Sequence, residues 1–178
     1  MKKTALICLL LLFPMAALAD HHDDAKLDPM LRQLDFMAGT FRCSGTAFAT
    51  PDMPQHATSA EVTGKWDESG YWLAATYAEK KSAENPKPFR FTGFFGYDPE
   101  IKKLIVGGVD NMGGYSSGTS DGTRGDTLVF TGPWHMHGKT VNSRDTFRKL
   151  GNGRMSHTGE LEQNGKWVKI GEETCTKQ

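Results

Sequence analysis

Two histidines stand two positions apart, at His135 and His137, and imidazole nitrogens are common metal ligands. On a β-strand the two side chains would share a face and could bind one Zn²⁺ or Cu²⁺ ion. The glycine and proline at 132–133 and Gly138 on the other side instead predict a loop. No third ligand lies nearby in the sequence. We therefore favour histidines in a surface loop, with a metal site as the alternative.

A second metal-binding pattern depends on where the chain is cleaved. Asp20, His21 and His22 follow a predicted cleavage site, so cleavage would leave a free amine two residues before His22. The amine, two backbone amides and that imidazole form a square-planar nitrogen set that suits Cu²⁺ or Ni²⁺. Such termini also arise by chance. We expect no resident cofactor, and haem, copper and zinc are the alternatives.

The third candidate is an acid–base pair on two neighbouring predicted strands. If Val141 and Phe147 point inward, Asp145 does so too, because side chains alternate along a strand. A buried carboxylate needs a partner, and His157 on the following strand could supply it. Such a pair raises the basicity of the imidazole, as a general base requires, and Arg144 would complete the set. We favour the alternative, an internal hydrogen bond that fixes the fold.

The first 19 residues have the three parts of a secretory signal peptide. A basic start at residues 1–3 precedes the apolar run 5–13, and Ala17 and Ala19 are the small residues that a signal peptidase recognises. The apolar run is too short to span a bilayer as a helix, and no later stretch approaches that length. We predict cleavage after Ala19, a flexible terminus at 20–26 and a mature chain in the periplasm or outside the cell.

The composition excludes two classes of protein. Lys+Arg and Asp+Glu both number 21, so the formal net charge is zero, whereas nucleic-acid binding depends on excess positive charge. Hydrophobic residues make up 38% of the 178 residues, which is too many for a disordered chain. The length suits a single domain, which we place at residues 27–178.

One helix and about ten strands must position these residues. Asp28 and Pro29 predict a helix start, as N-cap and first helical residue, and apolar residues at helical spacing carry it to about Ala38. Short alternating segments follow, separated by tight-turn sequences such as Asn164-Gly165, which are typical of antiparallel sheet. The predicted strands are 40–49, 57–67, 71–81, 89–97, 102–109, 114–120, 126–131, 139–149, 154–163 and 166–176.

So many strands with short connections favour closure into a barrel, because closure removes the exposed edges of a sheet. In an up-and-down barrel of even strand number, the first and last strands are antiparallel neighbours, and these strands carry Cys43 and Cys175. We expect a disulfide between them, as for an even pair of cysteines in an oxidising compartment. Two buried, unpaired thiols are the alternative.

Aromatic residues at alternate strand positions could line a cavity in such a barrel. Phe91 and Phe95 share one face of their predicted strand, Trp66 lies on an alternating face of another, and Tyr115 begins a third. We expect these four residues, together with His157, to contact a ligand. The alternative is that the aromatic residues form core.

The segment from Leu34 to Phe41, Leu-Asp-Phe-Met-Ala-Gly-Thr-Phe, resembles a bacterial family of uncharacterised lipocalin-like proteins. Gly96-Tyr97-Asp98 at mid-chain and the terminal Glu-Glu-Thr-Cys-Thr-Lys segment extend the likeness over residues 27–177. The resemblance implies a calycin-like barrel of about ten strands and no established activity.

The segment 39–47 is also similar to the opening Gly-x-Trp-x-Gly-x-Gly-x-Gly motif of the nitrobindin-like haem proteins. Phe41, Cys43 and Ala47 replace the Trp, the second Gly and the last Gly of that motif. In that family a histidine on a late strand binds the haem, and His157 is the residue that could match it. The similarity implies haem binding as an alternative function.

Taken together, these features predict an all-β, single-domain, up-and-down antiparallel barrel preceded by one short helix. We expect it to bind a small, mostly apolar molecule in its cavity without catalysis. The alternatives are an isomerase or lyase that uses Asp145, His157 and Arg144 inside the cavity, and a haem or metal carrier. The fold alone does not decide between them, since barrels of this kind host many functions.

Overall fold

The computed structural model describes residues 28–51 and 53–178. The predicted signal peptide and the terminus with His21 and His22 lie outside the described residues. The described chain begins with a short helix, η1 (Leu31–Met37), and continues in antiparallel strands. The strands are β1 (Gly39–Ala47), β2 (His56–Trp66), β3 (Leu73–Glu79), β4 (Arg90–Asp98), β5 (Lys103–Asp110), β6 (Tyr115–Ser120), β7 (Thr123–Arg124), β8 (Thr127–Met136), β9 (Lys139–Gly151), β10 (Arg154–Gln163) and β11 (Lys166–Lys177).

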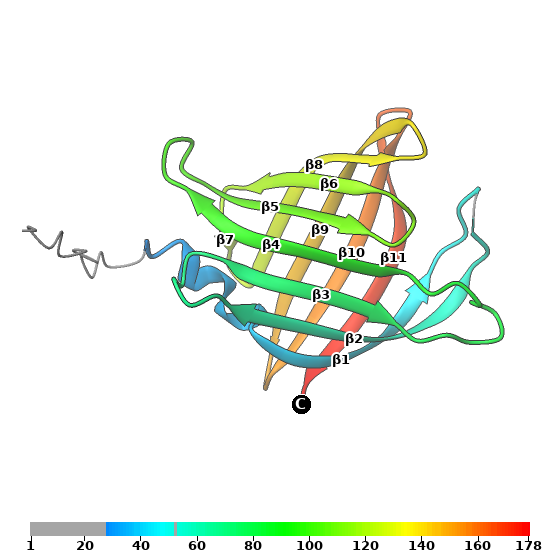
Figure 1. The fold of residues 1–178 in the computed structure, drawn as a ribbon, viewed down its shortest axis with the longest axis horizontal. Helices are drawn as coiled ribbons and strands as arrows, with labels where there is room; N and C mark the ends of the chain where they lie inside the picture. The colour runs from blue at the N-terminus through cyan, green and yellow to red at the C-terminus, as the bar shows by residue number, and fades with distance from the viewer. Residues whose placement is uncertain (1–27, 52) are drawn as a thin grey trace, which may run out of the picture.

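Ten of these strands close into a barrel (Figure 1). Strands that are consecutive in the chain pair from β1 to β6 and from β8 to β11. Two further pairings complete the cylinder, since β1 pairs with β11 and β6 pairs with β8. The two-residue β7 pairs beside the start of β8. The predicted fold class, an up-and-down barrel of about ten strands after one short helix, is confirmed.

The helix is shorter than predicted and of a different type. It is a 3₁₀ helix of 7 residues, whereas the sequence pattern predicts a helix from Asp28 to about Ala38. Its buried residues Leu31, Leu34 and Met37 are spaced by three, which matches the three residues per turn of a 3₁₀ helix and places them on one face. In the described part of the chain, no helix is long and apolar enough to cross a bilayer.

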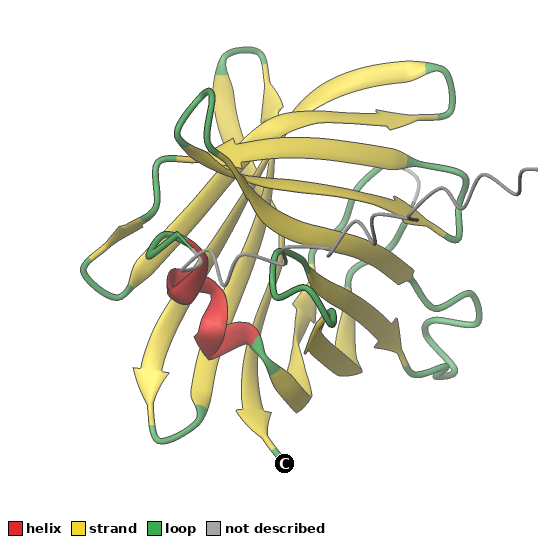
Figure 2. Ribbon diagram, turned by 60° about the vertical axis from the view of Figure 1, so that its left-hand side comes forward, coloured by secondary structure: helices red, strands yellow, loops and turns green. Residues whose placement is uncertain are grey.

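The helix fills one end of the barrel, which we call the closed end (Figure 2). Its buried face packs into the main core cluster, whose strand residues stand near that end: Phe41, Leu73, Phe95, Leu104, Leu128, Phe130, Met155 and Cys175. The long connections at residues 48–51 and 53–55 and at residues 80–89 lie at the other end, which we call the mouth (Figure 1). The barrel is therefore filled at one end and ringed by connections at the other.

Strand β8 is longer than predicted, and the expected loop at 132–138 is wrong. The strand continues through Pro133 to Met136, and the turn to β9 is confined to His137 and Gly138, whose φ angles are +51° and +74°. Proline is tolerated because residues 132–133 pair with β9 but have no partner on β6, so no hydrogen bond to β6 is lost.

The seam between β1 and β11 carries the predicted disulfide. Cys43 and Cys175 lie opposite each other in the register of these two strands, with Cα atoms 4.0 Å apart, and their sulfurs are bonded. The bond links positions 132 residues apart. It therefore fastens the first strand of the barrel to the last.

Replacing both cysteines, as Cys43→Ala with Cys175→Ala, should lower the free energy of unfolding by about 2–5 kcal/mol, because the bond closes a long loop in the unfolded chain. Urea denaturation with and without a reductant measures this effect. The wild-type midpoint should fall on reduction, and the double variant should not respond. A wild-type midpoint that is insensitive to complete reduction would contradict this role for the bond.

Candidate functional site

A cavity of about 320 Å³ occupies the barrel between the helix and the mouth. All ten barrel strands contribute to its lining, and Met37 of η1 reaches it from the closed end. Met53, Met112 and Leu161 line it at the mouth. Its volume falls at the lower end of the range typical of small-molecule sites.

Aromatic side chains form one wall of this cavity. The ring of Phe95 packs edge-on against Phe130 and Phe147, with centroids 5.3 Å and 6.2 Å away. This geometry is favourable for aromatic rings and holds them in fixed orientations. Phe91 and Val106 complete the wall. We call these five residues the aromatic wall.

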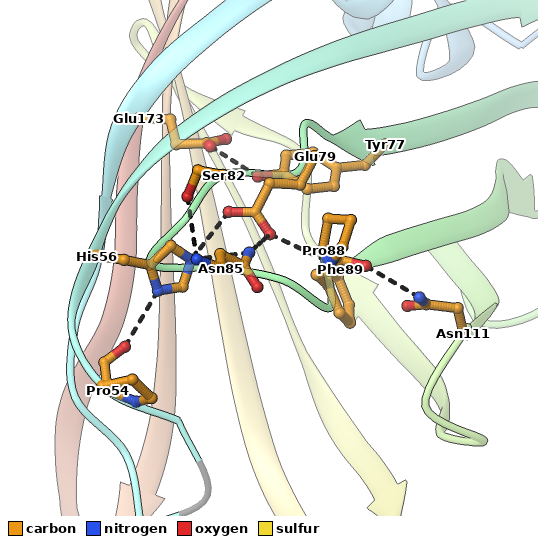
Figure 3. Close-up of polar contacts among 10 residues, drawn as sticks. All are labelled: Pro54, His56, Tyr77, Glu79, Ser82, Asn85, Pro88, Phe89, Asn111 and Glu173. Carbon is orange, nitrogen blue, oxygen red and sulfur yellow. Dashed lines mark hydrogen bonds and ion pairs between the residues drawn. The ribbon is translucent and has the colours of Figure 1, made fainter.

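Polar side chains enter the cavity from β3, β9, β10 and β11. Nε2 of His157 lies 2.9 Å from Oδ1 of Asp145, and its ring stacks on Phe147 with centroids 4.7 Å apart. Tyr77 reaches across from β3, and its hydroxyl donates to Oε1 of Glu173 on β11 at 2.8 Å (Figure 3). The cavity thus holds the predicted Asp145–His157 pair and a second pair that the sequence analysis did not identify.

Two of these groups have shifted pKa values. Burial raises the pKa of Tyr77, and the charge of Glu173, the hydrogen bond to it and the charge of Glu79 act in the same direction. Burial lowers the pKa of His157, but the hydrogen bond to Asp145 and the charges of Asp145 and Glu173 outweigh it, so the pKa of His157 is raised. Tyr77 is therefore a neutral hydrogen-bond donor, and His157 holds its proton more firmly than a free imidazole.

A third polar group, formed by His56, Glu79 and Asn85, lies at the mouth and is buried (Figure 3). The carboxylate of Glu79 lies 3.0 Å from Nε2 of His56 and accepts from Nδ2 of Asn85 at 2.6 Å and from the backbone N–H of Phe89 at 2.9 Å. Nδ1 of His56 lies 3.1 Å from the carbonyl of Pro54. We call this group the rim network, because it fastens both long connections to the barrel.

Three of the five residues predicted to contact a ligand line the cavity, and two do not. Phe91, Phe95 and His157 line the cavity. Trp66 packs against the core at the closed end, and its indole N–H donates to a carboxylate of η1 at 3.2 Å. Tyr115 is 56% exposed and stacks on the ring of a histidine outside the cavity. The structure therefore places Trp66 and Tyr115 away from the cavity lining.

Arg144 also lies away from the predicted position inside the cavity. It is adjacent to Asp145 in β9, so its side chain leaves the strand on the opposite face. Its Nε donates to Glu160 at 2.7 Å, and its guanidinium lies 4.5 Å from the centre of the Trp167 ring. The ion pair raises the pKa of Arg144, despite a smaller opposing effect of burial. Arg144 thus braces the barrel and does not join the Asp145–His157 pair.

The two histidines at the end of β8 do not share a strand face. His135 is paired in the strand, stacks on Tyr115 and lies 2.8 Å from the hydroxyl of Thr140, whereas His137 is in the turn. Among the described residues, the potential ligand atoms of Cys43, Glu173 and Cys175 gather within 4.8 Å, but these two cysteines are bonded to each other.

Sequence reasoning missed most of the polar cavity residues, although strand alternation contains the signal. Along β2, Thr58 and His56 lie two and four residues before buried Ala60 and so share its inward face. Glu173 lies two residues before Cys175, and a disulfide to the opposite strand fixes that side of β11. Side chains alternate between the inside and the outside of the barrel along the whole length of each strand. Following this alternation to the end of each strand would have placed these polar side chains inside the barrel.

Replacing Asp145 with Asn should return the pKa of His157 toward or below its ordinary value of 6.5, because the charge that stabilises the imidazolium is removed. The folded wild type binds this proton more tightly than the unfolded chain. The stability advantage of wild type over D145N is therefore complete below pH 6.5 and is lost as pH rises through the raised pKa. NMR titration of the His157 ring and urea unfolding across that range test both statements. Asp126→Asn, on the exposed surface, is the control, and an unchanged titration in D145N would contradict the assignment.

Replacing Glu79 with Ala should lower the free energy of unfolding by about 3–5 kcal/mol, because it removes the buried carboxylate that contacts His56 and accepts from Asn85 and from the backbone N–H of Phe89. Glu84→Ala, an exposed change in the same connection, should stay within about 0.5 kcal/mol of wild type. Urea denaturation compares the two variants. Equal stabilities would show that the rim network does not hold the connections.

Comparison with known proteins agrees with this fold. The crystal structure of Rv2717c from M. tuberculosis superposes with a TM-score of 0.63 at 16% sequence identity, covering 85% of this chain and 99% of that chain. At that identity the likeness shows the fold alone. None of the curated proteins matches the sequence. A family model described as a protein of unknown function, DUF1579, matches residues 28–177. The chain belongs to the DUF1579 family.

Proposed function

We propose that this protein is an exported barrel that binds a small, mostly apolar molecule in its cavity and does not catalyse a reaction. The observation that carries the proposal is the cavity of about 320 Å³, which is bounded by the aromatic wall and floored by the helix. Transfer of apolar surface from water to such a wall contributes about 25 cal/mol per Å². A molecule of modest size therefore gains enough free energy from burial to bind there.

Two features support export. The first 19 residues have the pattern of a signal peptide, and the bond between Cys43 and Cys175 is of the kind that persists in oxidising compartments. In this proposal the mature chain works in the periplasm or outside the cell.

The second candidate is an acid–base enzyme, and the contact between His157 and Asp145 in the cavity wall favours it. We place it second for two reasons. The raised pKa of His157 keeps the ring protonated to higher pH, which leaves less of the neutral imidazole that a general base needs, and stacking on Phe147 holds the ring in one orientation, as in a purely structural residue. Haem ligation through Nε2 of His157 would require displacement of Asp145 from that nitrogen.

Filling the cavity should abolish binding without unfolding the barrel. Ala75 faces the cavity from β3, whereas Ala74 faces outward beside the exposed ring of Phe94. Ala75→Phe should weaken uptake of the neutral fluorescent probe N-phenyl-1-naphthylamine by at least about tenfold, because the new ring occupies the hollow, and Ala74→Phe should leave uptake unchanged. Fluorescence titration measures the affinity, and circular dichroism checks the fold.

Native mass spectrometry of the protein purified from its own host provides an independent test. It should detect a bound small molecule whose amount falls in Ala75→Phe. Wild-type protein that is recovered empty and takes up no apolar probe would contradict the proposed function.

A further inference from the structure

The cavity lining is acidic, in contrast to its aromatic wall. Four acidic side chains face it: Glu79, Asp110, Asp145 and Glu173. Two imidazoles, those of His56 and His157, are the only basic side chains among the described residues that line it. A cavity with this charge distribution favours ligands that carry hydrogen-bond donors or positive charge.

Most of these carboxylates already have partners. Glu160 and Glu172 also border the cavity, but their side chains lie on the outer face of the barrel, where they pair with Arg144 and Lys169 at 2.7 Å and 2.6 Å. Asp110 accepts from two backbone N–H groups and from the indole of Trp134. Glu79 belongs to the rim network. These carboxylates therefore find their hydrogen-bond or ion-pair partners within the protein.

Glu173 differs from the other carboxylates of the lining. Its residue is 9% exposed, and its hydrogen-bond partner is the neutral hydroxyl of Tyr77. Across residues 28–51 and 53–178, none of the five ion pairs includes Glu173. Each of the two imidazoles already lies within hydrogen-bond distance of another carboxylate, His56 of Glu79 and His157 of Asp145. A buried carboxylate without a cationic partner is unfavourable until a donor reaches it.

The hydroxyl of Thr58 has no hydrogen-bond partner and lies level with Glu173 in the strand register, two strands away. Thr58 on β2, Gly45 on β1, Glu173 on β11 and His157 on β10 are consecutive partners in the strand register. Thr58 is 8% exposed, lines the cavity and has no hydrogen-bond partner for Oγ1. Strands lie about 4.8 Å apart, so roughly 10 Å of sheet separates the Cα atoms of Thr58 and Glu173.

Gly45 lies between Thr58 and Glu173 in the strand register. A Cβ at this position would collide with the backbone of Glu172 and Glu173, so the close approach of β1 to β11 requires glycine here. Thr58 and Glu173 both line the cavity and stand on either side of Gly45 in the register. An unpartnered hydroxyl and a carboxylate therefore lie two strands apart in the cavity lining.

We infer that the ligand of this cavity is an amphiphilic amine, with its ammonium group at Glu173 and Thr58 and its apolar body on the aromatic wall. This inference rests on the proposed function and names its ligand class. An ammonium offers three donors and no acceptor, which matches two acceptor groups and one uncompensated negative charge. A carboxylate head group, as in a fatty acid, would face Glu173 with like charge and is disfavoured.

Three probes with the same alkyl chain test this inference: octylamine, octan-1-ol and octanoate, titrated by calorimetry near neutral pH. The wild type should bind octylammonium at least tenfold more tightly than octanoate, with octanol between them. Glu173→Gln keeps an oxygen that accepts from Tyr77 but removes the charge. It should weaken octylammonium at least tenfold, strengthen octanoate and leave octanol within about twofold. Glu68→Gln, at an exposed turn, should change none of these affinities.

The outcomes separate this inference from the proposed function. Octanoate binding to the wild type as tightly as octylammonium, or a Glu173→Gln variant with an unchanged ratio between the two, would overturn the amine assignment while octanol binding still supported an apolar site. Failure of all three probes to bind would count against the proposed function itself. If Glu173→Gln does not fold, the wild-type preference among the probes decides.

Discussion

The pairing of β1 with β11 joins the two ends of the chain into one continuous sheet, and the other features of the barrel depend on it. The cavity row from Thr58 through Gly45 and Glu173 to His157 crosses this seam. A shift of one residue in the register would turn Glu173 outward and an exposed neighbour inward, because side chains alternate at every position. The bond between Cys43 and Cys175, two residues from Glu173, holds the register where the polar site needs it.

The polar groups inside the barrel fall into two kinds by how well they are satisfied. The rim network and the Asp145–His157 pair find their partners within the protein, so they stabilise connections and orient rings. Glu173 and Thr58 are left with fewer partners than their atoms can accept. Buried groups of the first kind are expected in any well-packed fold, whereas groups of the second kind reduce stability unless something else binds them.

Local patterns in the sequence predicted the architecture of the barrel but only part of the candidate site. Turn sequences such as Asn164-Gly165 and alternating segments located the barrel strands, and the positions of Cys43 and Cys175 predicted the seam. Pro133 predicted a break that does not occur, because whether a proline disrupts a strand depends on whether a neighbour needs its N–H. The pair of Tyr77 with Glu173 joins residues 96 apart across the interior, and no local pattern encodes such a contact.

The filled end of the barrel determines how molecules exchange with the interior. Because η1 and the core cluster occupy that end, the mouth is the route left for a molecule that arrives and for one that departs. An incoming molecule therefore cannot displace a bound one through the closed end. In the proposed binding function, release of the ligand depends on its spontaneous departure, so the inner contacts set its residence time.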